Sequence, residues 1–170
     1  KKAGRIAAEG ICDTCISEDG KVAAIVEVNS ETDFVAKNDT FKAYVADVCA
    51  QAAASDAKDI DAFLAETWAK DTSKTVNEAL AAQIAIIGEN MKIRRFEKVV
   101  AADGFVESYI HGGGKIGILV EFKSNVYTAA VRECAKNVAM QIAAMSPKYV
   151  RQSEISEENI AKEKEILKKQ

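Results

Sequence analysis

The chain has 170 residues, of which 48% are hydrophobic and 29% charged, and its net charge is −3 at pH 7. This composition is typical of a globular domain. Acidic and basic residues are interleaved without a basic stripe, which disfavours direct nucleic-acid binding, and no apolar run approaches the roughly 20 residues that span a membrane. Because the chain begins with Lys1 and shows no signal-peptide core, we expect it to be a piece of a longer polypeptide.

The first predicted element is a β-hairpin. Its strands are residues 11–17 and 21–28, joined by a turn at residues 18–20. The second strand places Val22, Ala24, Val26 and Val28 on one face, as a half-buried strand does. A helix follows, because apolar residues recur at helical spacing and Asp39 or Thr40 is placed to cap it. The residues expected on its buried face are Phe41, Tyr44, Val45, Val48, Cys49 and Ala52.

Two shorter helices and a strand come next. Thr75 and Glu78 form a capping-box pattern that opens the second of these helices, which we expect to run to about Ile87 and stop at Gly88. Residues 91–100 predict a strand with a bulge at its paired arginines, where the alternation breaks. The first of the short helices has an apolar face made by Ile60, Phe63, Leu64 and Trp68.

The second half of the chain repeats the first. At a shift of 94 positions Gly20 falls on Gly114, which predicts a second hairpin with strands over residues 105–111 and 115–122. The helix after this hairpin aligns with its counterpart at a shift of 90, so the first copy has four extra residues, within residues 29–38. The apolar face of the second helix is expected at Val131, Cys134, Ala135, Val138, Ala139 and Ile142.

The four extra residues place Phe34 in a segment that is otherwise polar. Additional loop length costs little conformational entropy, but an apolar side chain at a loop tip gains nothing unless something covers it. From the residues alone two positions stay open. Phe34 either packs under its own sheet or points outward, where another protein would cover it.

The C-terminal end is a charged helix that Ser156 caps, with Ile155 and Ile160 placed as a hydrophobic staple. So polar a helix needs a partner helix, which suggests a protruding helical hairpin. The predicted fold is α+β, with two related subdomains, each an antiparallel sheet with packed helices, followed by this charged helix. We expect the first subdomain over residues 1–88, the second over 89–150, and the start of the helical hairpin over 151–170.

Patterns for catalysis or metal binding are weak. Cys12 and Cys15 form a CxxC sequence, but positions three apart on a strand point to opposite faces, so unbridged thiols fit better than a redox pair. The single histidine, His111, lies at a turn without a partner for nucleophilic catalysis, and the glycines before Lys115 form a turn rather than a phosphate loop. We therefore expect no enzyme activity, no cofactor and no metal.

Four segments, in order, resemble landmarks of the elongation factor Ts family. Residues 29–38 contain the hallmark Thr-Asp-Phe-Val, and residues 88–95, 109–117 and 140–147 look like the other family motifs. The similarity extends over nearly the whole chain. The family fold consists of two related α+β subdomains, which agrees with the internal repeat.

The resemblance implies a guanine-nucleotide exchange factor that promotes GDP release from elongation factor Tu in the bacterial cytoplasm, with an organellar homologue left open. It also implies the absence here of an N-terminal helical module and of most of a dimerisation hairpin, so this piece would bind Tu more weakly than the intact factor. A homodimer stays open. By resemblance, the residues that contact Tu are Thr32, Asp33, Phe34, Val35, Ile87, Gly88 and His111.

Two rival functions stay open. A non-catalytic oligomerisation or protein-interaction module would self-associate through its sheets without binding Tu. A redox enzyme with Cys12 and Cys15 as its reactive pair would lose activity when either cysteine is replaced; this is the weakest of the three hypotheses.

Overall fold

Two antiparallel sheets form the centre of the protein in the computed structural model, which describes residues 4–169. The predicted ends of the first and last segments, residues 1–3 and 170, lie outside the described residues. The class is α+β, as predicted, because helices pack on both sheets. The first sheet has the order β1 (Glu9–Ile16), β2 (Val22–Ser30) and β3 (Met91–Val100), and the second pairs β4 (Gly104–His111) with β5 (Ile116–Lys123).

One face of the first sheet carries the main hydrophobic core. Ala24, Val26 and Val28 of β2 point to this face and are fully buried against α2 (Asp39–Ala54). Every residue predicted for the inner face of this helix is buried. The helix is capped by Asn38, whose Oδ1 accepts hydrogen bonds from the two amides that follow Asp39, so the predicted capping by Asp39 or Thr40 is wrong.

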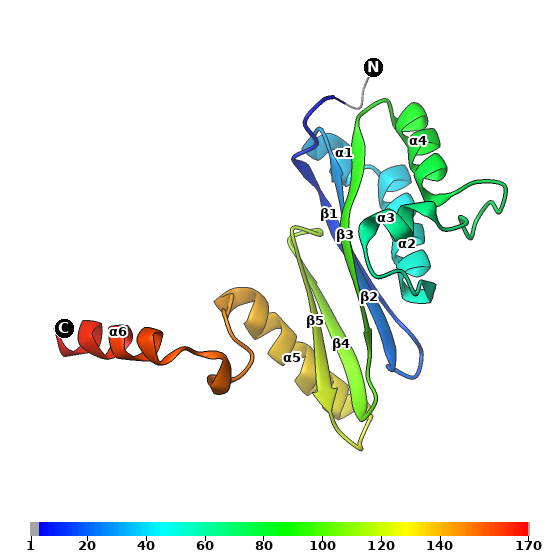
Figure 1. The fold of residues 1–170 in the computed structure, drawn as a ribbon. Coiled ribbons are helices and arrows are strands. Elements are labelled where there is room, and N and C mark those ends of the chain that lie inside the picture. The colour runs from blue at the N-terminus through cyan, green and yellow to red at the C-terminus, as the bar shows by residue number, and fades with distance from the viewer. Residues whose placement is uncertain (1–3, 170) are drawn as a thin grey trace.

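The β4–β5 hairpin packs against the opposite face of the first sheet (Figure 1). Ala23 points to this side and forms a small buried cluster with Ala101 and Val106. The outer side of the hairpin is covered by α5 (Ala129–Met145). The layers are therefore helix, three-stranded sheet, two-stranded hairpin and helix.

Helix α5 buries only part of the predicted face, because Ala135 and Ala139 are buried as expected and Val131 and Ile142 are half-buried. Ala135, Ala139 and Ala143 are its buried residues, whereas Cys134 and Val138 are exposed. Alanines at a spacing of four let a helix approach a sheet closely, and the larger side chains on either side are then turned outward. The apolar spacing therefore identified the helix and two of its three buried residues, but it missed Ala143 and wrongly included Cys134 and Val138.

Strand β3 corrects the predicted arrangement of the chain. The sequence predicts residues 91–100 as part of the second subdomain, yet β3 pairs with β2 in the first sheet. The expected bulge is confirmed, because Glu27 pairs with Arg95 and Val28 with Ile93, which leaves Arg94 as the extra residue. The bulge changes which alternate residues face the core, so Ile93 and Phe96 both point inward while the arginines stay outside.

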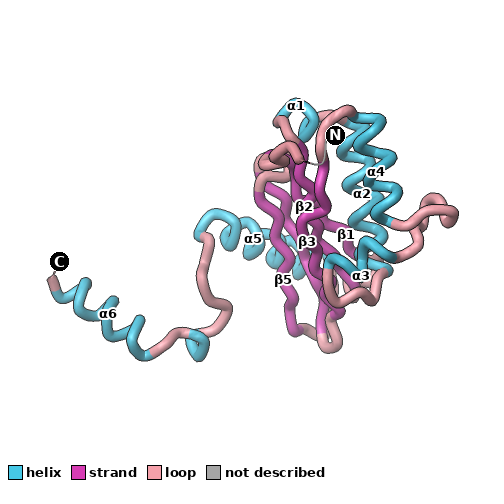
Figure 2. Tube along the Cα trace, turned by 45° about the horizontal axis from the view of Figure 1, so that its top comes forward, coloured by secondary structure: helices cyan, strands magenta, loops and turns pink. Residues whose placement is uncertain are grey.

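Two shorter helices connect α2 to β3 and lie on the side of α2 (Figures 1 and 2), namely α3 (Ile60–Ala65) and α4 (Val76–Ile87). The capping box of Thr75 and Glu78 is present, and Gly88 ends α4 in the left-handed conformation with φ 89°. Trp68 lies beyond the end of α3 rather than within it. Its ring lies 6.0 Å from that of Tyr44, and both side chains are buried.

The C-terminal segment extends away from the two sheets (Figure 1). A short 3-10 helix, η1 (Gln152–Glu154), precedes α6 (Glu157–Lys168), which Ser156 caps as predicted. No residue of α6 is buried. Among residues 4–169, none of the helices is both long and apolar enough to cross a bilayer.

Candidate functional site

The longer link of the first repeat folds as a short helix, α1 (Asp33–Lys37), between β2 and α2. Thr32 is its N-cap, and the Thr32 hydroxyl accepts a hydrogen bond from the amide of Val35 at 3.4 Å. A helix of five residues cannot persist on its own in water, because the cost of nucleation exceeds what a few hydrogen bonds return. Contacts with the rest of the fold must therefore hold α1 in place.

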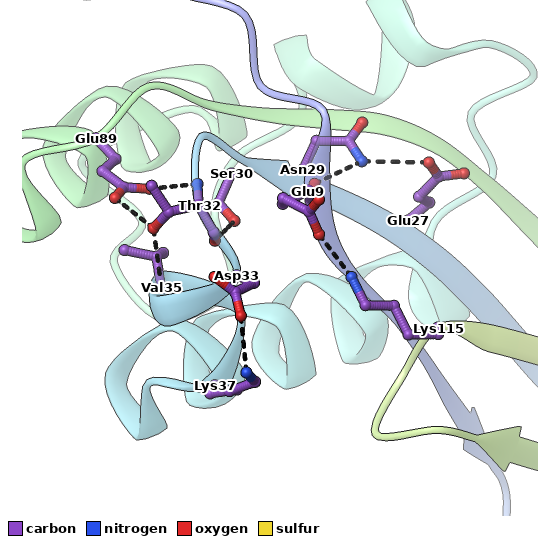
Figure 3. Close-up of polar contacts among 10 residues, drawn as sticks. All are labelled: Glu9, Glu27, Asn29, Ser30, Thr32, Asp33, Val35, Lys37, Glu89 and Lys115. Atoms are coloured by element: carbon purple, nitrogen blue, oxygen red, sulfur yellow. Dashed lines mark hydrogen bonds and ion pairs between the residues drawn. The ribbon is translucent and has the colours of Figure 1, made fainter.

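Glu89 supplies the strongest of these contacts. Its carboxylate accepts one hydrogen bond from the backbone amide of Thr32 at 3.0 Å and another from the Thr32 hydroxyl at 2.7 Å (Figure 3). Glu89 lies directly after the glycine that ends α4, 57 positions from Thr32 in the chain. The start of α1 is thus fixed to the end of α4.

A second carboxylate makes the reciprocal link. Glu31, at the end of β2, accepts a hydrogen bond from the backbone amide of Asn90 at 2.5 Å. The hydroxyl of Ser30, which is fully buried, donates to the carbonyl of Thr32 at 3.1 Å (Figure 3). Glu31 and Glu89 therefore cross between the two chain segments, and together they fix both sides of the turn that leads into α1.

The side chain of Phe34 points into solvent and is 81% exposed. Its neighbours Val35 and Ala36 pack inward against the main core, and Ala36 is buried. The helix therefore presents its small and aliphatic residues to the protein and its aromatic residue outward. Of the two positions left open by the sequence, the outward one is correct, although the segment is a helix and not a loop.

Charged side chains surround the base of α1. Lys37 Nζ lies 2.7 Å from a carboxylate oxygen of Asp33, and this hydrogen bond, together with the lysine charge, lowers the pKa of Asp33 (Figure 3). Nearby, Lys115 pairs with Glu9 at 2.6 Å. Asp33 is thus an ionised carboxylate at neutral pH, partly exposed beside Phe34, and it keeps hydrogen-bonding capacity toward solvent.

Ile87 and Gly88 form the C-terminal end of α4, which lies at the same end of the molecule as α1 (Figure 1). Ile87 is half-buried and packs against the protein's own core, and Gly88 is also half-buried. The preceding residue, Ile86, is 71% exposed. The sequence analysis does not identify Ile86, although it directly precedes Ile87 and Gly88, which the resemblance implies as contacts.

His111 lies at the end of β4, on the turn of the second hairpin, and is exposed. The Tyr109 hydroxyl lies 2.9 Å from His111 Nδ1. This turn rests on the first sheet, because Gly114 accepts a hydrogen bond from the backbone amide of Cys12 at 2.7 Å. The His111 turn and α1 therefore both pack against the first sheet. The side chains of His111 and Phe34 do not contact one another.

A pocket of about 430 Å³ lies beside His111, between the second hairpin and α5. Ile116 and Met140, both partly exposed, provide its apolar surface, and Asn137 and Gln141 provide polar groups. The pocket also includes the hydrogen-bonded pair of Tyr109 and His111. The pocket and the exposed side chains around α1 therefore each combine apolar surface with polar groups that a partner could contact.

Comparison with known proteins gives a consistent result. The model of the family described as elongation factor TS matches residues 31–170. Proteins named elongation factor Ts from Halothermothrix orenii, Clostridioides difficile and Clostridium kluyveri are 52%, 51% and 48% identical to the chain over all of its 170 residues. The chain covers 55–56% of the length of these relatives, a little over half.

The family match includes Thr32, Asp33, Phe34 and Val35, as well as the segment of Glu89 that holds them. The identity to the three relatives is well above the level at which a shared fold is in question. The chain belongs to the elongation factor Ts family.

Proposed function

We propose that this chain promotes the release of GDP from elongation factor Tu during translation elongation, and that Phe34 is the central contact. The observation that supports the proposal is an aromatic side chain, 81% exposed, on a helix whose N-cap Thr32 is held by the carboxylate of Glu89. A large apolar group held rigidly in solvent gains free energy when a partner buries it, and little ordering entropy is then lost. The proposed activity involves no covalent chemistry.

The energetics of nucleotide exchange follow from linkage. A factor weakens GDP binding only to the extent that it binds the nucleotide-free state of Tu more tightly than the GDP-bound state. A thousandfold weakening requires a coupling free energy of about 4 kcal/mol. One buried aromatic anchor commonly contributes about 2–4 kcal/mol, so Phe34 with a few neighbours is of the right magnitude.

Other residues take supporting roles in this proposal. Asp33 would accept hydrogen bonds from the G domain of Tu beside the nucleotide site, and Thr32 and Val35 would fix the orientation of the pair. Ile86, which is exposed next to Ile87 and Gly88, would extend the apolar contact. His111 would bind a different domain of Tu through the second hairpin.

The same linkage returns Tu to its active form. Because the coupling is reciprocal, a guanine nucleotide that enters the loosened site weakens binding of the factor by the same ratio. GTP at a concentration far above that of the factor therefore expels it, and the cycle can begin again. In this proposal the cycle takes place in the cytoplasm with Tu, and the chain would need neither a bound cofactor nor a bound metal for it.

The test is the release of a fluorescent GDP from purified Tu, measured by stopped flow with and without the chain. We expect the chain to accelerate release and the Phe34→Ala variant to lose at least 30-fold of that acceleration, since about 2 kcal/mol corresponds to this factor. Val150→Ala serves as the control, because Val150 is 88% exposed but lies beyond α5, far from α1 in the chain. It should behave as the unchanged protein does.

The rival function makes the opposite prediction. An oligomerisation module would self-associate in analytical ultracentrifugation and leave GDP release from Tu unchanged at any concentration of the chain. Release that is accelerated equally by the unchanged protein and by Phe34→Ala would retain exchange activity but reject Phe34 as its source.

A further inference from the structure

Two cysteines that are distant in the sequence meet beneath the first sheet. The Sγ atom of Cys15, on β1, lies 3.3 Å from the Sγ atom of Cys49, on α2. The Cys15 thiol also lies 3.2 Å from the carbonyl oxygen of Cys49. Cys12, the other half of the CxxC sequence, faces the second hairpin instead, where its Cβ lies close to Gly117.

The two thiols differ in exposure and in acidity. Cys49 is fully buried, whereas Cys15 is half-buried at the edge of the same core. A hydrogen bond from Cys49 lowers the pKa of Cys15 to about 7, although partial burial and the nearby Asp13 carboxylate oppose this. The same hydrogen bond and burial raise the pKa of Cys49. At neutral pH a fraction of Cys15 is therefore the nucleophilic thiolate, while Cys49 stays protonated.

We propose that Cys15 and Cys49 form an intramolecular disulfide when the folded protein meets a hydroperoxide. The Cys15 thiolate attacks one peroxide oxygen, the O–O bond breaks, and the products are a sulfenic acid on Cys15 and hydroxide. The Cys49 sulfur then attacks the Cys15 sulfur, the S–O bond breaks, and the departing hydroxide takes the Cys49 proton to form water. Each cysteine loses one electron and the hydroperoxide gains two.

The disulfide would enclose residues 16–48, which include β2 and the whole of α1. It would link β1 directly to α2, which are otherwise connected only through the 33 residues between the two cysteines. Because cross-links of this kind restrict the unfolded chain, we expect the oxidised protein to melt roughly 5–10 °C higher than the reduced one. Phe34 projects away from this core, so its exposure should not change.

The experiment uses the full chain with Cys12→Ser and Cys134→Ser, which leaves Cys15 and Cys49 as its two thiols. After treatment of the folded protein with hydrogen peroxide, we expect a loss of mass equal to two hydrogen atoms. A peptide that links Cys15 to Cys49 should appear in a non-reducing digest. Dithiothreitol should restore both the mass and the lower melting temperature.

A matched variant separates the two steps. When Cys49→Ser is added to the same background, a hydroxyl that can still donate a hydrogen bond to Cys15 replaces the resolving thiol. Cys15 should then stop at the sulfenic acid, which a 1,3-diketone reagent traps as an adduct. Cys15→Ser should instead leave Cys49 unmodified, because its sulfur is buried. In the unaltered chain the linked peptide should still join Cys15 to Cys49.

Three outcomes would overturn the proposal. One is over-oxidation of Cys15 to a sulfinic acid while Cys49 remains free, and another is a peptide that links Cys12 to Cys15 in the unaltered chain. The third is formation of the Cys15–Cys49 link only after the protein has been unfolded. None of these results depends on elongation factor Tu, so the outcome is independent of the function proposed above.

Discussion

Replacing Glu89 with alanine should loosen α1 while leaving the rest of the fold in place. The change removes the acceptor of two hydrogen bonds that hold Thr32, at 3.0 and 2.7 Å. A hydrogen bond to a charged group contributes about 1.5–3 kcal/mol, and the half-exposed position of Glu89 favours the lower end of this range. We therefore expect the opening of α1 to become easier by about 2 kcal/mol, or roughly 30-fold.

Hydrogen–deuterium exchange measured by mass spectrometry reports this opening directly. The helical hydrogen bonds of α1 include Ala36 N to Thr32 O at 3.3 Å and Asn38 N to Val35 O at 2.9 Å. In Glu89→Ala the amides of residues 35–38 should exchange roughly 30-fold faster, whereas amides of β2 and α2 should keep their rates. Acceleration of GDP release from Tu should fall with the population of ordered α1.

The chain contains a matched control in the capping box of α4. Glu78 accepts hydrogen bonds from the amide and hydroxyl of Thr75, at 2.8 and 3.2 Å, so the chemistry is the same as that of Glu89 with Thr32. Glu78→Ala should loosen the start of α4 and leave α1 unaffected. The reasoning is refuted if Glu89→Ala leaves exchange in α1 unchanged, or if Glu78→Ala accelerates it equally.

Two further predictions concern stability, measured by urea denaturation. Phe63→Ala should lower the free energy of unfolding by about 3–5 kcal/mol, because Phe63 is fully buried. Phe34→Ala should change it by less than about 0.5 kcal/mol, because Phe34 is exposed, and equal losses would contradict that exposure. Gly113 and Gly114 both have positive φ, but only at Gly114 would an added Cβ collide with a neighbour, 2.6 Å from Cβ of Ile11. Gly114→Ala should therefore reduce the free energy of unfolding by at least about 1 kcal/mol more than Gly113→Ala. The reverse order would contradict the packing of this turn against β1.

Much of the local structure was readable from the chain. Alternation and helical spacing identified both hairpins and the helices after them, and the capping residues Thr75 and Ser156 were correctly placed. These features depend on neighbours within a few positions, for which sequence distance and spatial distance agree. The four extra residues likewise indicated a special segment around Phe34, and its resemblance to the family hallmark agrees with the family match.

The pairing of distant segments was not readable in the same way. Strand β3 was assigned to the second subdomain because it follows the connecting helices, yet its bulge and its apolar residues complete the first sheet. Glu89 could not be recognised as the group that orders α1, since nothing in the sequence links it to Thr32 across 57 positions. The outward position of Phe34, which the sequence left open, likewise depends on the packing of α1 against the rest of the fold.

The cysteines show the same division most clearly. Strand periodicity alone was sufficient to separate Cys12 from Cys15, because the alternation of side chains is a property of a single strand. The partner that Cys15 meets, Cys49, lies on a helix whose packing against β1 is fixed only when the core closes. The sequence determined the elements and their faces through short-range geometry, while the tertiary structure decided which faces meet, because that choice depends on burying apolar surface across the whole chain.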